Sequence, residues 1–172
     1  FVPGSMGAFL VLEARAHAEA RGAKPYARIA AVASDRSRRK PGDARDALST
    51  LFERIAPDLP PGPLPVLSGA SGVEPVTAEE LEFLYGLEGE GLHPAIRAYG
   101  SRFGHGVEAH FPLGVALAAL ALRRGAFYPP CDQAGVEEPF DGAPARILVT
   151  SAGHWRGEGM ALLEAATSGE AR

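Results

Sequence analysis

The chain has 172 residues, of which 46% are hydrophobic and 22% are charged, and its formal net charge at pH 7 is −4. This length fits one ordinary globular domain. The mild acidic balance excludes a general nucleic-acid binder, because such a protein needs a strongly basic surface to neutralise phosphates.

The first part of the chain predicts two strands, each followed by a helix. Residues 7–13, GAFLVLE, form an apolar run of strand length, and the helical pattern ARAHAEARG follows. Because this strand lies so near Phe1, the chain is expected to start inside a fold. Residues 26–34 suit a second buried strand, and a basic loop follows it. Asp43 is expected to cap a helix that runs to about Ala56.

The second part continues the alternation. A stiff proline-rich connector, residues 57–65, precedes a short strand, and Thr77 with Glu80 forms a capping-box pattern for the next helix. The remaining predicted elements are a strand at 95–100, a long helix at about 106–124 and two final strands at 145–153 and 159–166. Alternating strands and helices indicate an α/β fold with layered sheets. The long helix is apolar on all sides from Leu113 onward, which predicts burial between two layers.

No segment has the pattern of a membrane anchor. The longest apolar run, Leu113 to Leu122, is about half of the ~20 residues that a membrane-spanning helix requires. Residues 1–12 lack the basic start of a signal peptide. The single cysteine, Cys131, excludes an internal disulfide and favours a reducing compartment. We therefore expect a soluble, cytoplasmic protein without a membrane span.

Two ungapped segments carry a resemblance to a known family. FVPGSMGAFLVLEARAHAEARGA resembles the pattern F-V-x-G-E-G-A-x-x-L-V-L-E followed by x-x-H-A-x-A-R-G-A, and GHGVEAHFPLGVALAALALRRGAFYPP is similar to a G-H turn, a buried helix and a P-P ending. These patterns are typical of β-ketoacyl-[acyl-carrier-protein] synthases, condensing enzymes of the thiolase fold. The resemblance implies that residues 1–172 are the family's C-terminal thiolase-like domain. The half that carries the nucleophilic cysteine is then absent from this chain, and Cys131 is structural.

The resemblance assigns the candidate catalytic positions. Members of the family use two neutral histidines as donors to a developing oxyanion. His105 matches the second of them, and a helix N-terminus keeps such a histidine neutral. Ser68 stands at the first histidine position, and Gly100 and Gly114 replace a lysine and its glutamate partner. Joint loss of an ion pair suggests a reshaped site. His105 is either an oxyanion donor or a histidine that only maintains the turn.

Two further loops are candidate functional segments: one differs from the family pattern, and the other is a basic run. The family's S-F-G-F-G-G-T-N loop, which gates the acyl pocket, corresponds here to SAGHWRGEG, with Ala152, Gly153, His154 and Trp155 at its centre. This loop is either a polar gate, with His154 as a further donor, or a surface turn. The run that contains Arg36, Arg38, Arg39 and Lys40 is either a solvated loop or a docking site for an acidic carrier protein.

No cofactor or metal is expected. His105 and His110 lie near each other in the sequence, but no third ligand is evident beside them. His17 and His93 are expected to be structural.

Three hypotheses for function follow from these residues and this resemblance. The first is a non-catalytic ketosynthase homologue, similar to a chain-length factor, that pairs with an active ketosynthase in fatty-acid or polyketide biosynthesis. The second is an active synthase, an acyltransferase in which Ser68 or His154 assists His105. The third is a pure interaction module without an acyl ligand. The implied partners are an acyl carrier protein and a ketosynthase subunit or the missing N-terminal half, in a hetero- or homodimer.

Overall fold

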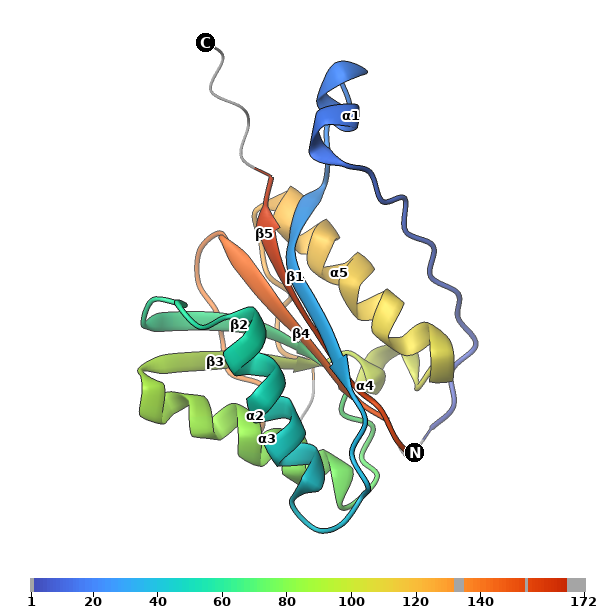
Figure 1. Ribbon diagram of the computed structural model, residues 1–172, viewed down its shortest axis with the longest axis vertical. Helices are drawn as coiled ribbons and strands as arrows, with labels where there is room; N and C mark the ends of the chain where they lie inside the picture. Colours follow the sequence, from blue (N-terminus) through green and yellow to red (C-terminus); the bar gives the residue numbers. More distant parts are fainter. Residues whose placement is uncertain (1, 132–134, 154, 167–172) are drawn as a thin grey trace.

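A five-stranded mixed sheet lies between two helical layers (Figure 1). The computed structural model describes residues 2–131, 135–153 and 155–166. The strands are β1 (Ala27–Asp35), β2 (Gly62–Ser68), β3 (Leu92–Ala98), β4 (Arg146–Ala152) and β5 (Glu158–Ala165). The helices are α1 (Arg15–Ala20), α2 (Asp43–Ile55), α3 (Val76–Gly86), α4 (Gly100–Phe103) and α5 (His110–Arg124), with short 3-10 helices at Leu87–Glu90 and Val107–Ala109.

The order of the strands in the sheet is β1-β5-β4-β2-β3. β2 runs parallel to both β3 and β4, whereas β5 is antiparallel to β4 and to β1. Ser68, at the end of β2, pairs with Ala98 on one side and Thr150 on the other. The carboxyl ends of three strands therefore meet at one edge of the sheet. The segment from Tyr99 to the start of α5 begins at this same edge.

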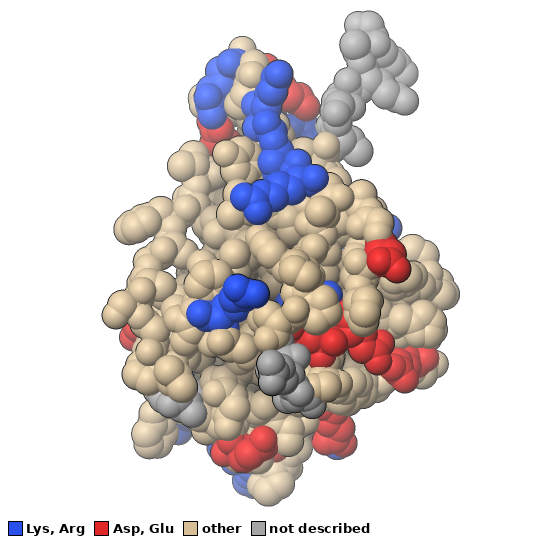
Figure 2. All heavy atoms as spheres, turned by 180° about the vertical axis from the view of Figure 1, so that it is seen from behind, with Lys and Arg blue, Asp and Glu red and all other residues tan. Residues whose placement is uncertain are grey.

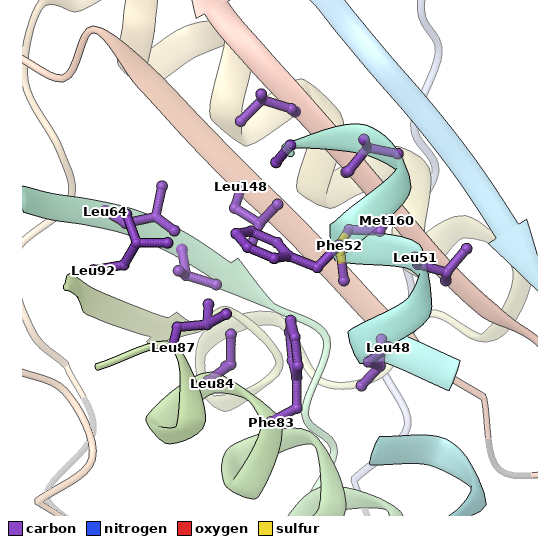
Figure 3. Close-up of a cluster of buried hydrophobic side chains, with 14 of the residues drawn as sticks. Leu48, Leu51, Phe52, Leu64, Phe83, Leu84, Leu87, Leu92, Leu148 and Met160 are labelled. Atoms are coloured by element: carbon purple, nitrogen blue, oxygen red, sulfur yellow. The ribbon is translucent and has the colours of Figure 1, made fainter. Parts of the chain in front are cut away.

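Each face of the sheet carries its own apolar core, because successive side chains of a strand point to opposite faces. On β4, Leu148 belongs to the core beneath α2 and α3, whereas Ile147 and Val149 belong to the core beneath α5. Figure 3 shows the first of these cores. It is built around Leu48, Leu51, Phe52, Leu64, Phe83, Leu84, Leu87, Leu92, Leu148 and Met160. Phe52 and Phe83 join α2 to α3 by an edge-to-face contact at 5.9 Å between ring centroids.

The prediction of an α/β fold is confirmed, but the predicted first strand is wrong. Residues 4–14 belong to no helix or strand, and the side chain of Phe9 is 97% exposed. In Figure 1 these residues form an extended trace that leads to α1. Their sequence has strand character, but a strand also needs a partner for its backbone groups. The described part of the chain offers such a partner only at Pro3, which bridges to His105.

The predicted helix caps differ from those in the structure. α3 begins at Val76, so Thr77 lies inside the helix and forms no capping box with Glu80. The helix predicted from Asp43 has Gly42 as its N-cap residue. The carboxylate of Glu79, from α3, accepts hydrogen bonds from the backbone N–H groups of Gly42 and Ala44, each at 2.9 Å. A side chain from another helix thus satisfies donors that the sequence pattern assigns to local caps. β2 likewise begins at Gly62, inside the predicted proline-rich connector.

The long apolar helix α5 is not buried on every side in this chain. Its sheet-facing side contains Val115, Ala118 and Leu122, whereas Leu120, on the other side, is 37% exposed. Figure 2 shows the molecule from behind, with a broad area that carries no charged side chains. The composition of α5 predicts two covered faces. The described residues bury only the face toward the sheet.

Candidate functional site

Two stacked histidines occupy the edge where the carboxyl ends of the parallel strands meet. The rings of His105 and His110 lie 4.1 Å apart between centroids, with an angle of 25° between their planes. The ring of Tyr99 lies 4.4 Å from that of His110. All three residues are buried, and His105 retains 8% exposure. His105 lies in the turn after α4, and His110 is the first residue of α5.

The backbone fixes the orientation of the His105 ring. Its Nδ1 accepts a hydrogen bond from the Val107 N–H at 3.1 Å, so the neutral ring carries its proton on Nε2. Val107 has φ +50°, a left-handed conformation that β-branched residues rarely adopt. Such backbone strain is typical of positions where the geometry serves a function. His105 therefore has the tautomer that an oxyanion donor at Nε2 requires.

Ser68 has a different setting from His105. It is fully buried, and its hydroxyl donates to Oε1 of Glu80 at 2.7 Å while accepting the Ala70 N–H at 3.1 Å. Thr150 donates to the same carboxyl oxygen at 2.5 Å. Burial raises the pKa of Glu80, and the hydrogen bonds from Thr150, Ser68 and the Gly69 backbone only partly oppose it. The Ser68 hydroxyl thus belongs to an interior polar cluster.

The two glycines at the expected ion-pair positions are packed against aromatic residues. A β-carbon on Gly100 would lie 3.6 Å from Cε1 of His110, and one on Gly114 would lie 2.9 Å from the hydroxyl of Tyr99 and 2.8 Å from Cγ1 of Val149. The Tyr99 hydroxyl donates to the His110 carbonyl at 3.1 Å, and burial raises the Tyr99 pKa far above its ordinary value. Aromatic side chains therefore pack beside both glycines.

The predicted basic run separates into two groups. Arg36, Arg38 and Lys40 are exposed, in agreement with either a solvated loop or a docking surface. Arg39 turns inward, where its guanidinium bonds the carboxylate of Glu158 and the carbonyl of Gly153. Its charge is therefore engaged within the protein.

The predicted gating loop connects β4 to β5 beside a groove of about 380 Å³. Gly153 lines this groove and closes the turn by donating its N–H to Gly157 at 2.8 Å. Ala152 is buried at the end of β4, and Trp155 is 88% exposed. His154 lies outside the described residues. The groove is lined by Val32, Ala33, Ser34, Phe111, Ser151, Gly153, Gly157, Glu158 and Gly159.

The part of the chain that the structure describes contains no cluster of three or more histidine, cysteine or acidic residues able to hold a metal ion. Cys131 is partly exposed, and its backbone N–H donates to the carboxylate of Glu137 at 2.6 Å. Within the same described ranges, no helix has the length and apolar character needed to cross a membrane.

Sequence reasoning missed three contributors to these sites: Glu80, His110 as a stacking partner, and Glu158 as the partner of Arg39. A signal existed for two of them. His110 lies close in sequence to the missing ion pair, and Glu158 is an acidic residue at the start of an apolar strand.

Comparison with known proteins identifies the fold. No protein-family model matches the chain, and no curated protein matches it. Among solved structures, the ishigamide ketosynthase/chain length factor matches with a TM-score of 0.79 at 18% identity over 95% of this chain and 44% of that one. An oxazolomycin ketosynthase domain of Streptomyces albus JA3453 matches with a TM-score of 0.69 at 19% identity over 89% of this chain and 48% of that one.

A third match is a ketosynthase of a type II polyketide synthase, solved in complex with its acyl-carrier protein. Its TM-score is 0.68 at 19% identity, and the match covers 90% of this chain and 42% of that one. The chain thus spans less than half the length of each of these three structures. Over that part, it has the α/β thiolase-like fold of ketosynthases and chain length factors.

Proposed function

We propose that this chain is the C-terminal thiolase-like domain, residues 1–172, of a ketosynthase-like subunit in polyketide or fatty-acid biosynthesis. Its role is that of a non-catalytic partner, similar to a chain length factor, for an active β-ketoacyl synthase. The setting of Ser68 carries this proposal. At the position of the first expected donor, a fully buried hydroxyl already donates to Glu80.

The chemistry of condensation explains why this observation matters. Decarboxylation of a malonyl thioester builds negative charge on an oxygen, and donors must lie about 2.7–3.1 Å from it in the transition state. Loss of one such donor lowers kcat by about 10²- to 10³-fold. Here only His105 retains the required ring, and the charges expected at Gly100 and Gly114 are replaced by Tyr99 and His110. These features support a site that has been rebuilt for packing.

The exposed apolar surface supports the proposal that another domain or subunit packs against this one. The outer side of α5 and the extended residues 7–13 expose side chains such as Phe9, Val11 and Leu120. A face of this kind on a folded domain marks an interaction site. We propose that it packs on the remaining half of the protein or on a ketosynthase subunit, in a hetero- or homodimer.

An acyl carrier protein is the second proposed partner. The exposed Arg36, Arg38 and Lys40 give a local positive charge on a chain of net charge −4, which would steer an acidic partner toward this loop. The ketosynthase similar to this chain was solved with its own acyl-carrier protein. We place the encounter in the cytoplasm, in keeping with the single cysteine of the chain.

A condensation assay on the full-length product tests this function. The protein is supplied with malonyl- and acyl-carrier protein, alone and with a co-expressed ketosynthase, and carbon dioxide release and product length are followed. The proposal expects no release by the protein alone, and a product length in the pair that differs from that of the ketosynthase alone. Condensation by the protein alone contradicts it.

One observation favours an alternative, an active β-ketoacyl synthase with atypical donors. His105 is held with its proton on Nε2 by a strained Val107, as an oxyanion donor requires. In that case the protein alone releases carbon dioxide, and His105→Ala abolishes the release. Ser68→Ala distinguishes the donors, because a serine that acts only in the interior cluster changes stability without changing the rate at permissive temperature.

A further inference from the structure

The groove and the basic loop share one ion pair, Arg39–Glu158. Both carboxylate oxygens of Glu158 are engaged: one accepts the Ser37 N–H at 3.0 Å, and the other accepts the Ser37 hydroxyl at 2.9 Å together with the Arg39 guanidinium. The same guanidinium also donates to the Gly153 carbonyl. One arginine thus bonds both ends of the connection between β4 and β5.

This contact has the features of a built site. The side chain of Glu158 is 0% exposed and that of Arg39 is 16% exposed. Arg39 has φ +62°, which is uncommon for residues other than glycine, asparagine and aspartate. The flanking Arg38 and Lys40 are exposed. Arg39 thus differs from its exposed neighbours: its backbone is strained and its side chain contacts a buried carboxylate. We infer that its bonds to Glu158 and Gly153 hold it in this position.

The partners of Arg39 are also walls of the groove. Gly153 and Glu158 line it on the side of the β4–β5 connection, and Val32, Ala33 and Phe111 supply apolar surface from β1 and α5. A movement of the connection would displace these walls and so change the shape of the groove. The guanidinium opposes that movement by its simultaneous bonds to Gly153 and Glu158.

We propose that Arg39 and Glu158 are specificity-determining residues that fix one wall of the groove as a rigid stop for an apolar acyl chain. This inference rests on the proposed function for its ligand, and on the ion pair alone for its mechanism. Because Arg39 is engaged internally, it takes no part in carrier docking, which the exposed Arg36, Arg38 and Lys40 retain.

Hydrogen exchange in the full-length protein tests the mechanism without any assay of activity. In Arg39→Met, peptides that contain Gly153 and Gly157 are expected to exchange at least ten times faster than in the wild type. Arg38→Met removes the same charge from an exposed neighbour and is expected to leave these peptides unchanged. The double variant Arg39→Met/Glu158→Gln leaves no buried charge unpaired, so it allows the measurement if Arg39→Met does not fold. Unchanged exchange in the double variant overturns the proposal.

Product analysis with the co-expressed ketosynthase tests the specificity. The double variant is expected to shift the main product by at least one two-carbon unit, whereas Arg38→Met keeps the wild-type length. Faster exchange with an unchanged product length overturns the role in specificity and leaves the proposed function intact. If the wild-type protein does not alter product length at all, the proposed function fails, and this role fails with it.

Discussion

The cluster around His105 and the groove beside the β4–β5 connection differ in whether they contain charged side chains. Around His105, the positions where the resemblance expects a lysine and a glutamate are glycines, and the rings of Tyr99 and His110 pack beside them. We call this part, which lacks the expected ion pair, the neutral end, and the part around Arg39 and Glu158 the charged end. Beside the groove, the buried Glu158 forms an ion pair with the partly buried Arg39. A buried pair is favourable only where further hydrogen bonds satisfy its polar atoms. Ser37 and Gly153 supply such bonds at the groove, whereas Nε of Arg39 is buried without a hydrogen-bond partner among the described residues.

The largest expected effect comes from restoring one charge at the neutral end. Gly114→Glu brings a β-carbon within 2.8 Å of Val149 and 2.9 Å of the Tyr99 hydroxyl, and it buries an unpaired carboxylate. We expect a loss of about 4 kcal/mol or more in the free energy of unfolding, measured by chemical denaturation. Gly86→Glu is the matched control, because a β-carbon there meets nothing within 4 Å.

A smaller side chain at position 99 makes the Gly114→Glu test more specific. If the ring occupies the space of the lost carboxylate, Tyr99→Val combined with Gly114→Glu is less destabilised than the sum of the single variants by about 1 kcal/mol or more. Strict additivity of the two changes would show that Tyr99 does not fill that space.

Removal of the cation at the charged end has the next largest effect. Arg39→Met leaves the buried Glu158 carboxylate with its hydrogen bonds from Ser37 but without its cation, and we expect a loss of about 3 kcal/mol in the free energy of unfolding. Arg39→Met/Glu158→Gln is expected to lose less than Arg39→Met alone, because the uncompensated charge is gone. A thermal or urea melt of both variants decides this. The charged end is not an ion-pair site if the double variant is the less stable of the two.

The sequence predicts the elements better than the contacts between them. Apolar runs locate β1, β4 and β5, and an amphipathic pattern locates α2, each within a few residues. β4 and β5 are largely buried, but the predicted burial of β1 is wrong, because this strand lies at the edge of the sheet and none of its residues is buried. Residues 7–13 have the same composition but belong to no strand, because pairing depends on another sheet edge rather than on local sequence.

The same limit applies to the candidate site. The resemblance locates His105, but the Thr77 and Glu80 pattern is identical for a local cap and for a side chain that reaches Ser68 and Thr150 across the core. The structure selects the second arrangement. Stacking of His110 on His105 depends on the turn geometry at Val107. The spacing of the two histidines in the sequence does not predict that geometry.

The buried carboxyl of Glu80 offers a further test of the neutral end. Here a rise in pH, rather than a mutation, introduces the negative charge. Burial raises its pKa above the ordinary 4.5, so the folded state holds this proton more tightly than the unfolded state does. Its stabilising effect is complete below pH 4.5 and is lost as pH rises through the folded-state pKa. The loss amounts to about 1.4 kcal/mol for each pH unit that separates the pKa of the folded state from that of the unfolded state. Glu80→Gln keeps the shape without the titration.

Urea denaturation of wild type and Glu80→Gln at several pH values measures this effect. The difference between the two proteins should move in favour of the variant as pH rises above 4.5. Stability curves that stay parallel across that range would mean that Glu80 keeps an ordinary pKa in the fold. The neutral end would then contain a buried carboxylate, and the contrast with the groove would disappear.

The smallest effect concerns a single hydrogen bond at the neutral end. Tyr99→Phe removes the donor to the His110 carbonyl and leaves the ring packing intact, so we expect a loss of about 1 kcal/mol in the free energy of unfolding. His110→Phe is the companion variant, because it preserves a flat ring beside Tyr99 and His105. If aromatic packing holds this end together, both variants stay within about 1–2 kcal/mol of the wild type, well below the effect at Arg39. A larger loss in Tyr99→Phe would mean that the hydroxyl, rather than the ring, replaces the lost charges.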